Sequence, residues 1–448
     1  MEGTRESRST ASTVASFLER IAVMFDRLRA ANALDRLRRG DASLWTSADE
    51  AQWLGWLDLP ERSLRALPAL EELVAAARSD GIDRVVVLGM GGSSLGAEAL
   101  VRCGPRVALD IAELVLLDTT DPDRVADAEA ALRGHQPLFV CSSKSGTTLE
   151  TALLQAYWLE RYDAASFVAV TDPGTQLENE ARAKGFRAVL PGDREVGGRF
   201  SVLSAFGLLP AALCGIGVRE VLDAAVRARD SVFGGGSDGE RRVEGLAALL
   251  GAAATTGRDK LTVLAPQHLR SFGWWLEQLL AESLGKNGRG VVPVLDEDYA
   301  PAARYRPDRA FLWLDDEGDP RSAAERERLA AAGRELVAAG QPVERLPIDT
   351  RDLGAELYRW EVVTALAGHL LAVHPFDQPD VEAAKVATRR YVEALRRGEA
   401  LPRAASVTAG AVELSGYGGG TGEAEGGGGK VAPSSAASAV AGLLAAAR

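Results

Sequence analysis

The sequence predicts an α/β protein with a helical N-terminal segment and two lobes, each a mainly parallel sheet flanked by helices. Apolar residues recur at helical spacing from about residue 12 to residue 80. From Arg84 onward, short apolar runs alternate with helical patterns, which is typical of a parallel sheet covered by helices on both faces. A second alternating set follows a Gly-rich stretch at residues 233–240, so we expect a second sheet of the same kind.

The alternation divides the chain into four parts. They are a helical segment at 1–80, a first lobe at 81–233, a second lobe at 240–400 and a Gly- and Ala-rich tail at 401–448. We expect the stretch 233–240 to link the lobes and the tail to be disordered, apart from an Ala-rich helix at its end. The longest uncharged run, residues 201–218, is expected to form one buried helix because it is short and broken for a membrane span.

Each expected element has its own pattern in the sequence. The expected strands are 85–88, 113–118, 138–141, 167–171 and 186–191 in the first lobe, and 261–266, 291–295, 311–314 and 343–349 in the second. The helices expected between and after them include 149–162, 176–185, 271–284, 322–340 and two between 352 and about 397. Ligands of such sheets bind beyond the carboxyl ends of the strands, so the turns that follow strands are the candidate sites.

Composition and charge limit the classes of function. The chain has 448 residues, 46% of them hydrophobic, and a formal net charge of −12. Such an acidic chain does not suit broad binding to nucleic acid or to anionic membranes. The N-terminus is polar and shows no secretory signal, and the three cysteines have no metal-ligand spacing. We therefore expect a cytoplasmic protein with no metal.

The turn SSKSGTT, residues 142–148, offers five hydroxyls, one ammonium and a glycine between an apolar strand and a helix. The first-turn N–H groups of a helix lack intrahelical partners and lie at the positive end of its dipole, where phosphate binds readily. Ser143, Lys144, Ser145, Thr147 and Thr148 are therefore candidate phosphate ligands. The alternative is an ordinary N-cap, but a cap needs only one or two hydroxyls.

A second turn, GMGGSSLG at residues 89–96, also lies between a strand and a helix. It does not complete the dinucleotide pattern GxGxxG, because Ser94 occupies the third glycine position. Gly92 and Ser93 would instead let a small anionic ligand approach the backbone and a hydroxyl. A plain tight turn is the alternative, and a dinucleotide-binding oxidoreductase ranks below both.

Two further motifs contain side chains suited to chemistry at an anionic substrate. Arg199, next to Gly198 in GGRFS, could stabilise a developing oxyanion, or it could be a surface residue. Gln278 and Glu282 lie four apart and so share a helical face, where a partly buried glutamate could act as general base; a solvated surface glutamate is the alternative.

The loop HPFDQPDVEAAK at residues 374–385 leads into a helix. Its Gln378 and Lys385 could contact a ligand or lie on the surface. His374 has no metal-spaced partner, so we interpret it as a capped or core histidine.

Together, SSKSGTTLET, GMGGSSLG, GGRFSVLSAFGLLP, EQLLAESLGKNGRG and FDQPDVEAAK occur in an order that resembles the phosphoglucose isomerase (glucose-6-phosphate isomerase) family. The resemblance runs from about residue 15 to about residue 395 and implies two sugar-isomerase (SIS) lobes. WLGWLDLP and HPFDQPDVEAAK are most similar to the isomerase half of bacterial transaldolase–isomerase fusion proteins. The family interconverts D-glucose 6-phosphate and D-fructose 6-phosphate in glycolysis and gluconeogenesis.

The resemblance also implies a role for each motif. Glu282 matches the base that moves a proton between C2 and C1 through a cis-enediol, Arg199 the group that stabilises the enediolate, and Lys385 a lysine near the ring oxygen. The matching substrate ligands are Gly92, Ser93, Ser143, Lys144, Ser145, Thr147, Thr148, Gly198, Gln278 and Gln378. A homodimer with no metal or organic cofactor is implied.

One feature of the family pattern is missing from this chain. The family histidine that helps to open the sugar ring has no match, since the four histidines lie at positions 135, 268, 369 and 374. Two alternatives to a full isomerase therefore stay open. The chain could bind sugar phosphates with impaired or no isomerisation, or it could isomerise another sugar phosphate.

Overall fold

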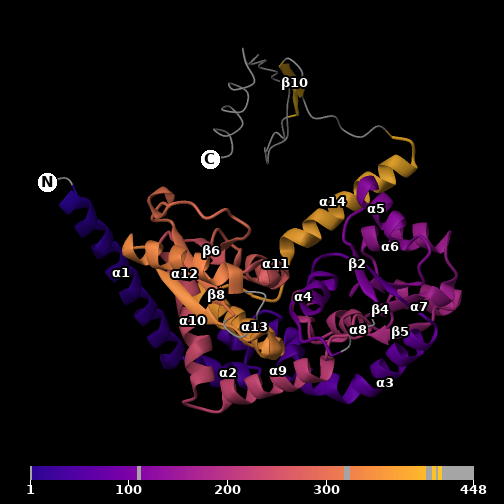
Figure 1. The fold of residues 1–448 in the computed structure, drawn as a ribbon, viewed down its shortest axis with the longest axis horizontal. Coiled ribbons are helices and arrows are strands. Elements are labelled where there is room, and N and C mark those ends of the chain that lie inside the picture. The colour runs from indigo at the N-terminus through magenta and orange to yellow at the C-terminus, as the bar shows by residue number, and fades with distance from the viewer. Residues whose placement is uncertain (1–2, 108–111, 317–322, 400–405, 410–411, 416–448) are drawn as a thin grey trace. The chain divides into compact units, whose positions relative to one another are not determined.

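The computed structural model describes residues 3–107, 112–316, 323–399, 406–409 and 412–415 (Figure 1). These residues form two compact units, Met1–Asp377 and Gln378–Arg448. The first unit contains the five-stranded and the four-stranded sheet and ends before residue 400, the end expected for the second lobe. The second unit contains helix α14 (Pro379–Arg396) and an antiparallel hairpin of β10 (Ser406–Ala409) and β11 (Val412–Ser415).

The first unit contains two parallel sheets, as the alternating pattern predicts. The strands are β1 (Arg84–Gly89), β2 (Glu113–Leu117), β3 (Pro137–Ser142), β4 (Phe167–Thr171), β5 (Ala188–Pro191), β6 (Lys260–Leu264), β7 (Val292–Val294), β8 (Arg309–Asp315) and β9 (Val343–Pro347). The first sheet has the order β2-β1-β3-β4-β5 and the second the order β7-β6-β8-β9, with every pairing parallel. In each sheet the chain leaves the first strand to one side and later returns to its other side, so β1/β3 and β6/β8 are topological switch points.

Helices precede, separate and follow these strands. They are α1 (Gly3–Ala30), α2 (Ala33–Arg38), α3 (Leu59–Ser79), α4 (Leu95–Cys103), α5 (Pro122–Leu132), α6 (Leu149–Leu159), α7 (Gln176–Lys184), α8 (Ala205–Leu213), α9 (Val218–Phe233), α10 (Asp238–Thr255), α11 (Arg270–Leu284), α12 (Ala323–Ala338) and α13 (Leu353–Leu371). None within the described ranges has the length and hydropathy needed to cross a membrane.

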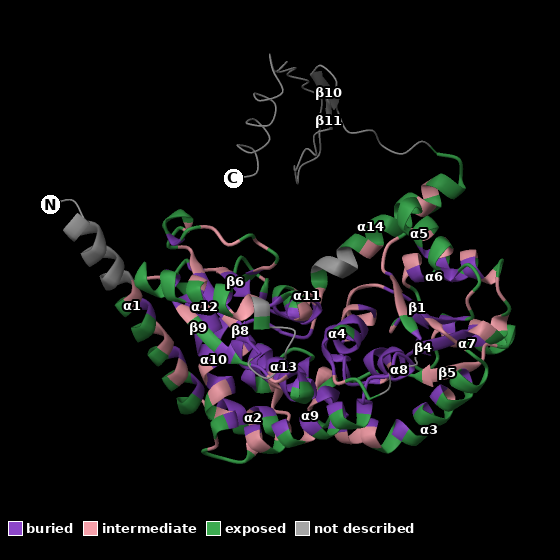
Figure 2. Cartoon of the chain, in the orientation of Figure 1, coloured by how far each residue is buried: buried purple, intermediate pink, exposed green. Residues whose placement is uncertain are grey.

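Side chains of alternate strand residues enter different cores, because successive residues of a strand face opposite sides of a sheet. In β1, Val85 and Val87 join a large core that also takes in α3, α4, α8, α9, α10, α11 and α13. Val86 and Leu88 face a smaller core with α5, α6 and α7. In the second sheet, Leu312 belongs to the large core, which is therefore shared by both sheets. Figure 2 shows α8 and α13 buried along nearly their whole length.

Two segments differ from the expected helix and linker. The uncharged run 201–218 contains the short helix α8, which begins after the N-cap Ser204 and ends before Gly215, whose φ is +76°. Residues 233–240 span the end of α9, a turn at 234–237 and the start of α10, and the two helices contact each other. Ser237 caps α10 through a bond from the backbone N of Glu240, so this stretch is a tight helix–helix turn. Most of the expected tail, including its Ala-rich end, lies outside the described residues.

Candidate active site

The turn after β3 gathers its hydroxyls in pairs at the start of α6. Ser143 Oγ lies 2.9 Å from Thr148 Oγ1, and Ser145 Oγ lies 3.0 Å from Thr147 Oγ1. Gly146 between them has a φ of +65°, a conformation that L side chains rarely adopt. Thr148 is the N-cap of α6 but makes no capping bond with its side chain among the described contacts. The candidate phosphate ligands are thus brought together, and the first turn of α6 is not capped by the side chain at its N-cap.

Lys144 lies in the same turn but has its charge paired within the protein. Its Nζ forms an ion pair with the Asp172 carboxylate and donates to the backbone O of Asp193, 2.8 Å away. Burial raises the pKa of the Asp172 carboxyl, and the hydrogen bond from Lys144 opposes this rise. In this structure Lys144 therefore connects the turn to the segments after β4 and β5.

The turn after β1 lies beside the turn after β3, because these strands pair in register from Arg84 with Pro137 to Gly89 with Ser142. The second turn contains a short 3-10 helix, η4 (Gly91–Ser93), which packs on another, η6 (Gly198–Phe200). A Cβ atom at Gly92 would lie 2.4 Å from the backbone C and O of Gly198. Only glycine at position 92 permits this approach of the two backbones.

Helix α11 adds Gln278 and Glu282 to the same place. A Cβ atom at Gly91 would lie 2.6 Å from Gln278 Nε2, so η4 lies directly against this side chain. Gln278 Nε2 donates to Glu282 Oε2 at 3.2 Å, as expected for residues four apart on one helical face. Glu282 Oε1 lies 3.2 Å from Arg199 Nη1 in an ion pair. The predicted base and the predicted oxyanion group are therefore neighbours.

Arg199 is held on several sides. Its side chain is 2% exposed, against 19% for Glu282. Nε donates to Ser283 Oγ at 2.6 Å, and Nη2 donates to the backbone O of Pro375 at 2.6 Å and of Asp377 at 2.9 Å. Burial lowers the pKa of the guanidinium, and the carboxylates of Glu282 and Asp377 oppose that shift. The guanidinium is therefore shielded from water, and charges interact more strongly there than in water. Its Nη1 atom faces Glu282.

An open pocket of ≈ 410 Å³ lies along this face of α11. Its lining residues are Leu95, Trp274, Glu277, Gln278, Ala281 and Glu282. The pocket gives a small substrate access to Glu282. Among the described residues, no group of three His, Cys, Asp or Glu side chains could hold a metal ion.

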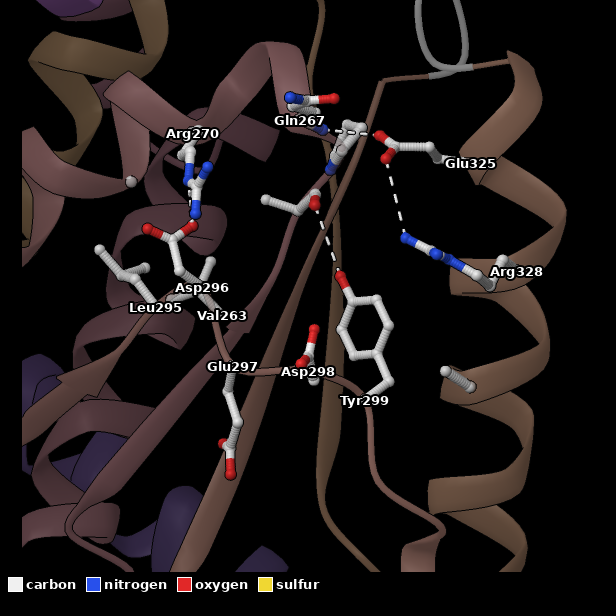
Figure 3. Close-up of a pocket in the computed structure, with 14 residues that line it drawn as sticks. Val263, Gln267, Arg270, Leu295, Asp296, Glu297, Asp298, Tyr299, Glu325 and Arg328 are labelled. Atoms are coloured by element: carbon white, nitrogen blue, oxygen red, sulfur yellow. Dashed lines mark hydrogen bonds and ion pairs between the residues drawn. The ribbon is translucent and has the colours of Figure 1, made fainter.

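A second pocket, of ≈ 460 Å³, lies at the carboxyl ends of β6 and β7 (Figure 3). Several of its charged groups have partners within the protein, among them Glu297, which pairs with Arg309 outside the pocket. Arg270 Nε lies 2.5 Å from Asp296 Oδ1, and Glu325 accepts from the backbone N of Gln267 at 2.6 Å. None of the sequence-predicted ligands lines this pocket, so we place the candidate active site at the first one.

The four histidines are bound to other parts of the chain. Nε2 of His268 lies 3.0 Å from Asp316 Oδ2, and Nδ1 of His135 lies 2.7 Å from Asp83 Oδ2. His369 Nδ1 lies 2.6 Å from the backbone O of Leu44. His374 is 6% exposed and bonds to backbone N–H groups, as expected for a capped or core histidine.

Gln378 and Lys385 belong to the second unit, just before α14 and within it. Their expected roles at the site stay predictions. The sequence did not single out Ser283 or the backbone carbonyls of Pro375 and Asp377, all of which bind Arg199. Ser283 follows Glu282 in the chain, which is a weak signal, whereas a carbonyl ligand has no residue-type signal at all.

The family model and the similar curated proteins agree on one family. Residues 73–293 match the family model of phosphoglucose isomerase. A probable glucose-6-phosphate isomerase of Haloarcula marismortui is 31% identical over 363 residues, covering 72% of this chain and 80% of its own. The glucose-6-phosphate isomerase of Symbiobacterium thermophilum is 32% identical, covering 75% and 86%. The crystal structure of a hypothetical protein from Thermus thermophilus has a TM-score of 0.68 at 26% identity, covering 84% of this chain and 98% of that one.

Proposed function

The chain belongs to the phosphoglucose isomerase family, and on this premise we propose that it interconverts D-glucose 6-phosphate and D-fructose 6-phosphate. The observation that carries the proposal is the contact of Glu282 with both Arg199 and Gln278 beside an open pocket. A carboxylate held next to a buried guanidinium is suited to moving a proton beside a carbonyl while the cation stabilises the oxyanion that forms.

In this mechanism Glu282 removes the proton from C2 of the open-chain aldose and returns it to C1 of the cis-enediol. In the same conversion the hydroxyl proton of O2 passes to O1, so the aldose becomes the ketose and Glu282 ends in its starting state, with no net proton consumed. Arg199 Nη1, 3.2 Å from Glu282, would lie near the oxygen that carries the developing negative charge. Its other donors are fixed by Ser283 and two carbonyls, so little reorganisation is required as the charge develops.

The turn at residues 142–148 would hold the phosphate. Its paired hydroxyls and the first-turn N–H groups of α6 suit three phosphate oxygens, and binding there would align C1 and C2 with Glu282. Gly92, Ser93 and Gly198 would contact the substrate from the adjoining turns. Lys144, paired with Asp172, would mainly shape this turn.

Further parts of the proposal rest on the family alone. Gln378 would contact the sugar, and Lys385 would lie near the ring oxygen. The homodimer, the role in glycolysis and gluconeogenesis, the cytoplasmic location and the similarity to the transaldolase fusions also stay predictions.

The test is a coupled assay in which fructose 6-phosphate is supplied and glucose 6-phosphate is measured. Glu282→Gln should lower kcat by at least about 1000-fold while sugar-phosphate binding by calorimetry stays within a few-fold, because the phosphate turn is untouched. Glu71→Gln is the matched control, since Glu71 is a half-exposed glutamate paired with Arg219 and does not line the pocket. Full activity of Glu282→Gln would remove Glu282 from this role.

One observation supports a second candidate function, a sugar-phosphate-binding protein with impaired isomerisation. All four histidines have hydrogen-bond partners within the protein, and the sequence match found none in the position of the family's ring-opening histidine. Tight binding of fructose 6-phosphate without turnover would favour this function. Turnover of another sugar phosphate in a substrate panel would instead identify the true substrate.

A further inference from the structure

His374 organises the three residues that follow it. Its Nδ1 accepts hydrogen bonds from the backbone N of Phe376 and of Asp377, both at 3.1 Å. Its Nε2 lies 2.8 Å from Asp49 Oδ1. Because Nδ1 is an acceptor, the ring proton is on Nε2, and the Asp49 carboxylate accepts it. Asp49 thus fixes the tautomer that the loop requires.

Lys286 holds the same loop from another element, the turn after α11. Its Nζ donates to the backbone O of His374, to the backbone O of Asp377 at 2.9 Å and to the Asp377 carboxylate. The side chain is only 9% exposed. These three acceptors use the three donors of the ammonium, so Lys286 has none left for a substrate.

The loop at residues 375–377, held in this way, is what binds Arg199. The carbonyls of Pro375 and Asp377 both accept from Nη2 of Arg199, whose Nη1 faces Glu282. A guanidinium is a rigid planar fork, so fixing Nη2 also fixes the direction of Nη1. If the loop moved, Nη2 would move with it, and Nη1 would shift relative to the Glu282 carboxylate.

We propose that Asp49, His374 and Lys286 are positioning residues for the proton transfer, which they serve by holding the loop that orients Arg199 against Glu282. The proposal rests on the proposed isomerase function. Because Asp49 belongs to the N-terminal segment, that segment would support the proton transfer indirectly, through His374. Asp49 is half-exposed, so its removal need not disturb the core.

The test compares kcat and KM for fructose 6-phosphate in Asp49→Ala and Lys286→Met with the full-length wild type. We expect kcat to fall by about 10- to 100-fold in each, the range seen when supporting partners of a catalytic group are lost. KM should stay within about three-fold, since the phosphate turn makes none of these contacts. Asp49→Asn keeps an acceptor oxygen for Nε2–H and should retain most of the wild-type kcat.

Two matched controls separate positioning from general stability. Asp83→Ala removes the partner of His135, an Asp–His pair of similar length at the amino end of the first sheet, whose aspartate is as exposed as Asp49. Lys260→Met removes an ion-paired lysine at the amino end of β6. Both should keep kcat within about two-fold even if the melting temperature falls. Folded Asp49→Ala and Lys286→Met with wild-type kcat, or with a raised KM alone, would overturn the proposal.

Hydrogen exchange gives a readout that does not depend on turnover. The amides of Phe376 and Asp377 should exchange faster in Asp49→Ala than in the wild type, and at the wild-type rate in Asp83→Ala. Unchanged exchange in Asp49→Ala would overturn the anchoring of the loop. A wild type with no turnover on any sugar phosphate would overturn the proposed function, and positioning for proton transfer with it, whatever the exchange rates. If Lys286→Met does not fold, Asp49→Ala, at a half-exposed position, decides the question.

Discussion

Arg199 is bound by two separate segments of the chain, the end of α11 and the loop at residues 375–377. Lysine at this position would keep the charge but could not bind Ser283, two carbonyls and Glu282 in one plane. We expect Arg199→Lys to lower kcat by about 100-fold or more, with a smaller change in KM, because the lost interaction forms mainly with the enediolate. Steady-state kinetics with fructose 6-phosphate measure both constants. A wild-type kcat would show that charge alone is sufficient.

A substitution at Gly92 tests whether the close contact between the turns η4 and η6 is needed for activity. In Gly92→Ala the new methyl group would lie 2.4 Å from the Gly198 carbonyl and 2.8 Å from the backbone N of Arg199, which are backbone atoms that cannot rotate away. The turns should separate, and we expect kcat/KM for fructose 6-phosphate to fall by about 100-fold. Gly245→Ala is the control, because nothing lies within 4 Å of its Cβ position. Equal activities of the two variants would contradict the prediction.

At the scale of elements, the strands were the most predictable part of the fold. Each strand of the two parallel sheets overlaps a strand expected from the sequence. The signal is clearest for β3 and β4, which are buried along their whole length and largely apolar. Helix ends were less predictable. The uncharged run at 201–218 was expected as one helix because it is apolar on both sides of the break, yet α8 stops before Gly215, whose positive φ suits glycine past a helix end. Hydrophobicity locates an element, but local turn chemistry sets its ends.

Helix α13 contains a buried acid, Glu361, which should make the stability of the protein depend on pH. Glu361 is fully buried, and both carboxylate oxygens have no partner among the described contacts. Burial raises its pKa well above the usual value of 4.5. The folded protein therefore holds Glu361 protonated while the unfolded chain releases the proton, so stability falls as pH rises above about 4.5, until the folded pKa is reached.

Glu361→Met removes this penalty with a side chain of similar length. The gain in free energy of unfolding over the wild type should grow by about 1.4 kcal/mol per pH unit from about pH 5 up to the folded pKa of Glu361. Urea unfolding at several pH values measures the gain. Glu71→Gln, at a half-exposed position, should show little such growth. If the free energies of unfolding of the wild type and Glu361→Met change with pH in the same way, Glu361 is not held protonated in the folded protein.

At the scale of the whole molecule, the sequence identified which residue types form the site but not how they meet. The turns after β1 and β3 could be placed together because parallel strands share a carboxyl edge. The contact of α11 with α4, η4 and η6, which brings Glu282 to Arg199, depends on packing between lobes and has no local signal. The hydrogen bonds from Lys286 to the carbonyls of His374 and Asp377 also have no local signal, because these residues lie 88 and 91 positions further along the chain. Long-range contacts of backbone atoms are therefore the part of the site that the sequence could not predict.

The division into two units leads to a last prediction, about shortening the chain. All three hydrophobic cores lie within Met1–Asp377, so a chain of residues 1–377 should fold with native-like circular dichroism and a cooperative melt. It lacks Gln378 and Lys385, and we expect it to lose at least about 100-fold in kcat. A chain of residues 1–399 keeps both residues and all of α14, which ends at Arg396, so its kcat should stay within about two-fold of the full chain. Full turnover by residues 1–377 would remove Gln378 and Lys385 from the mechanism, whereas loss of turnover in residues 1–399 would assign a function to the C-terminal residues 400–448.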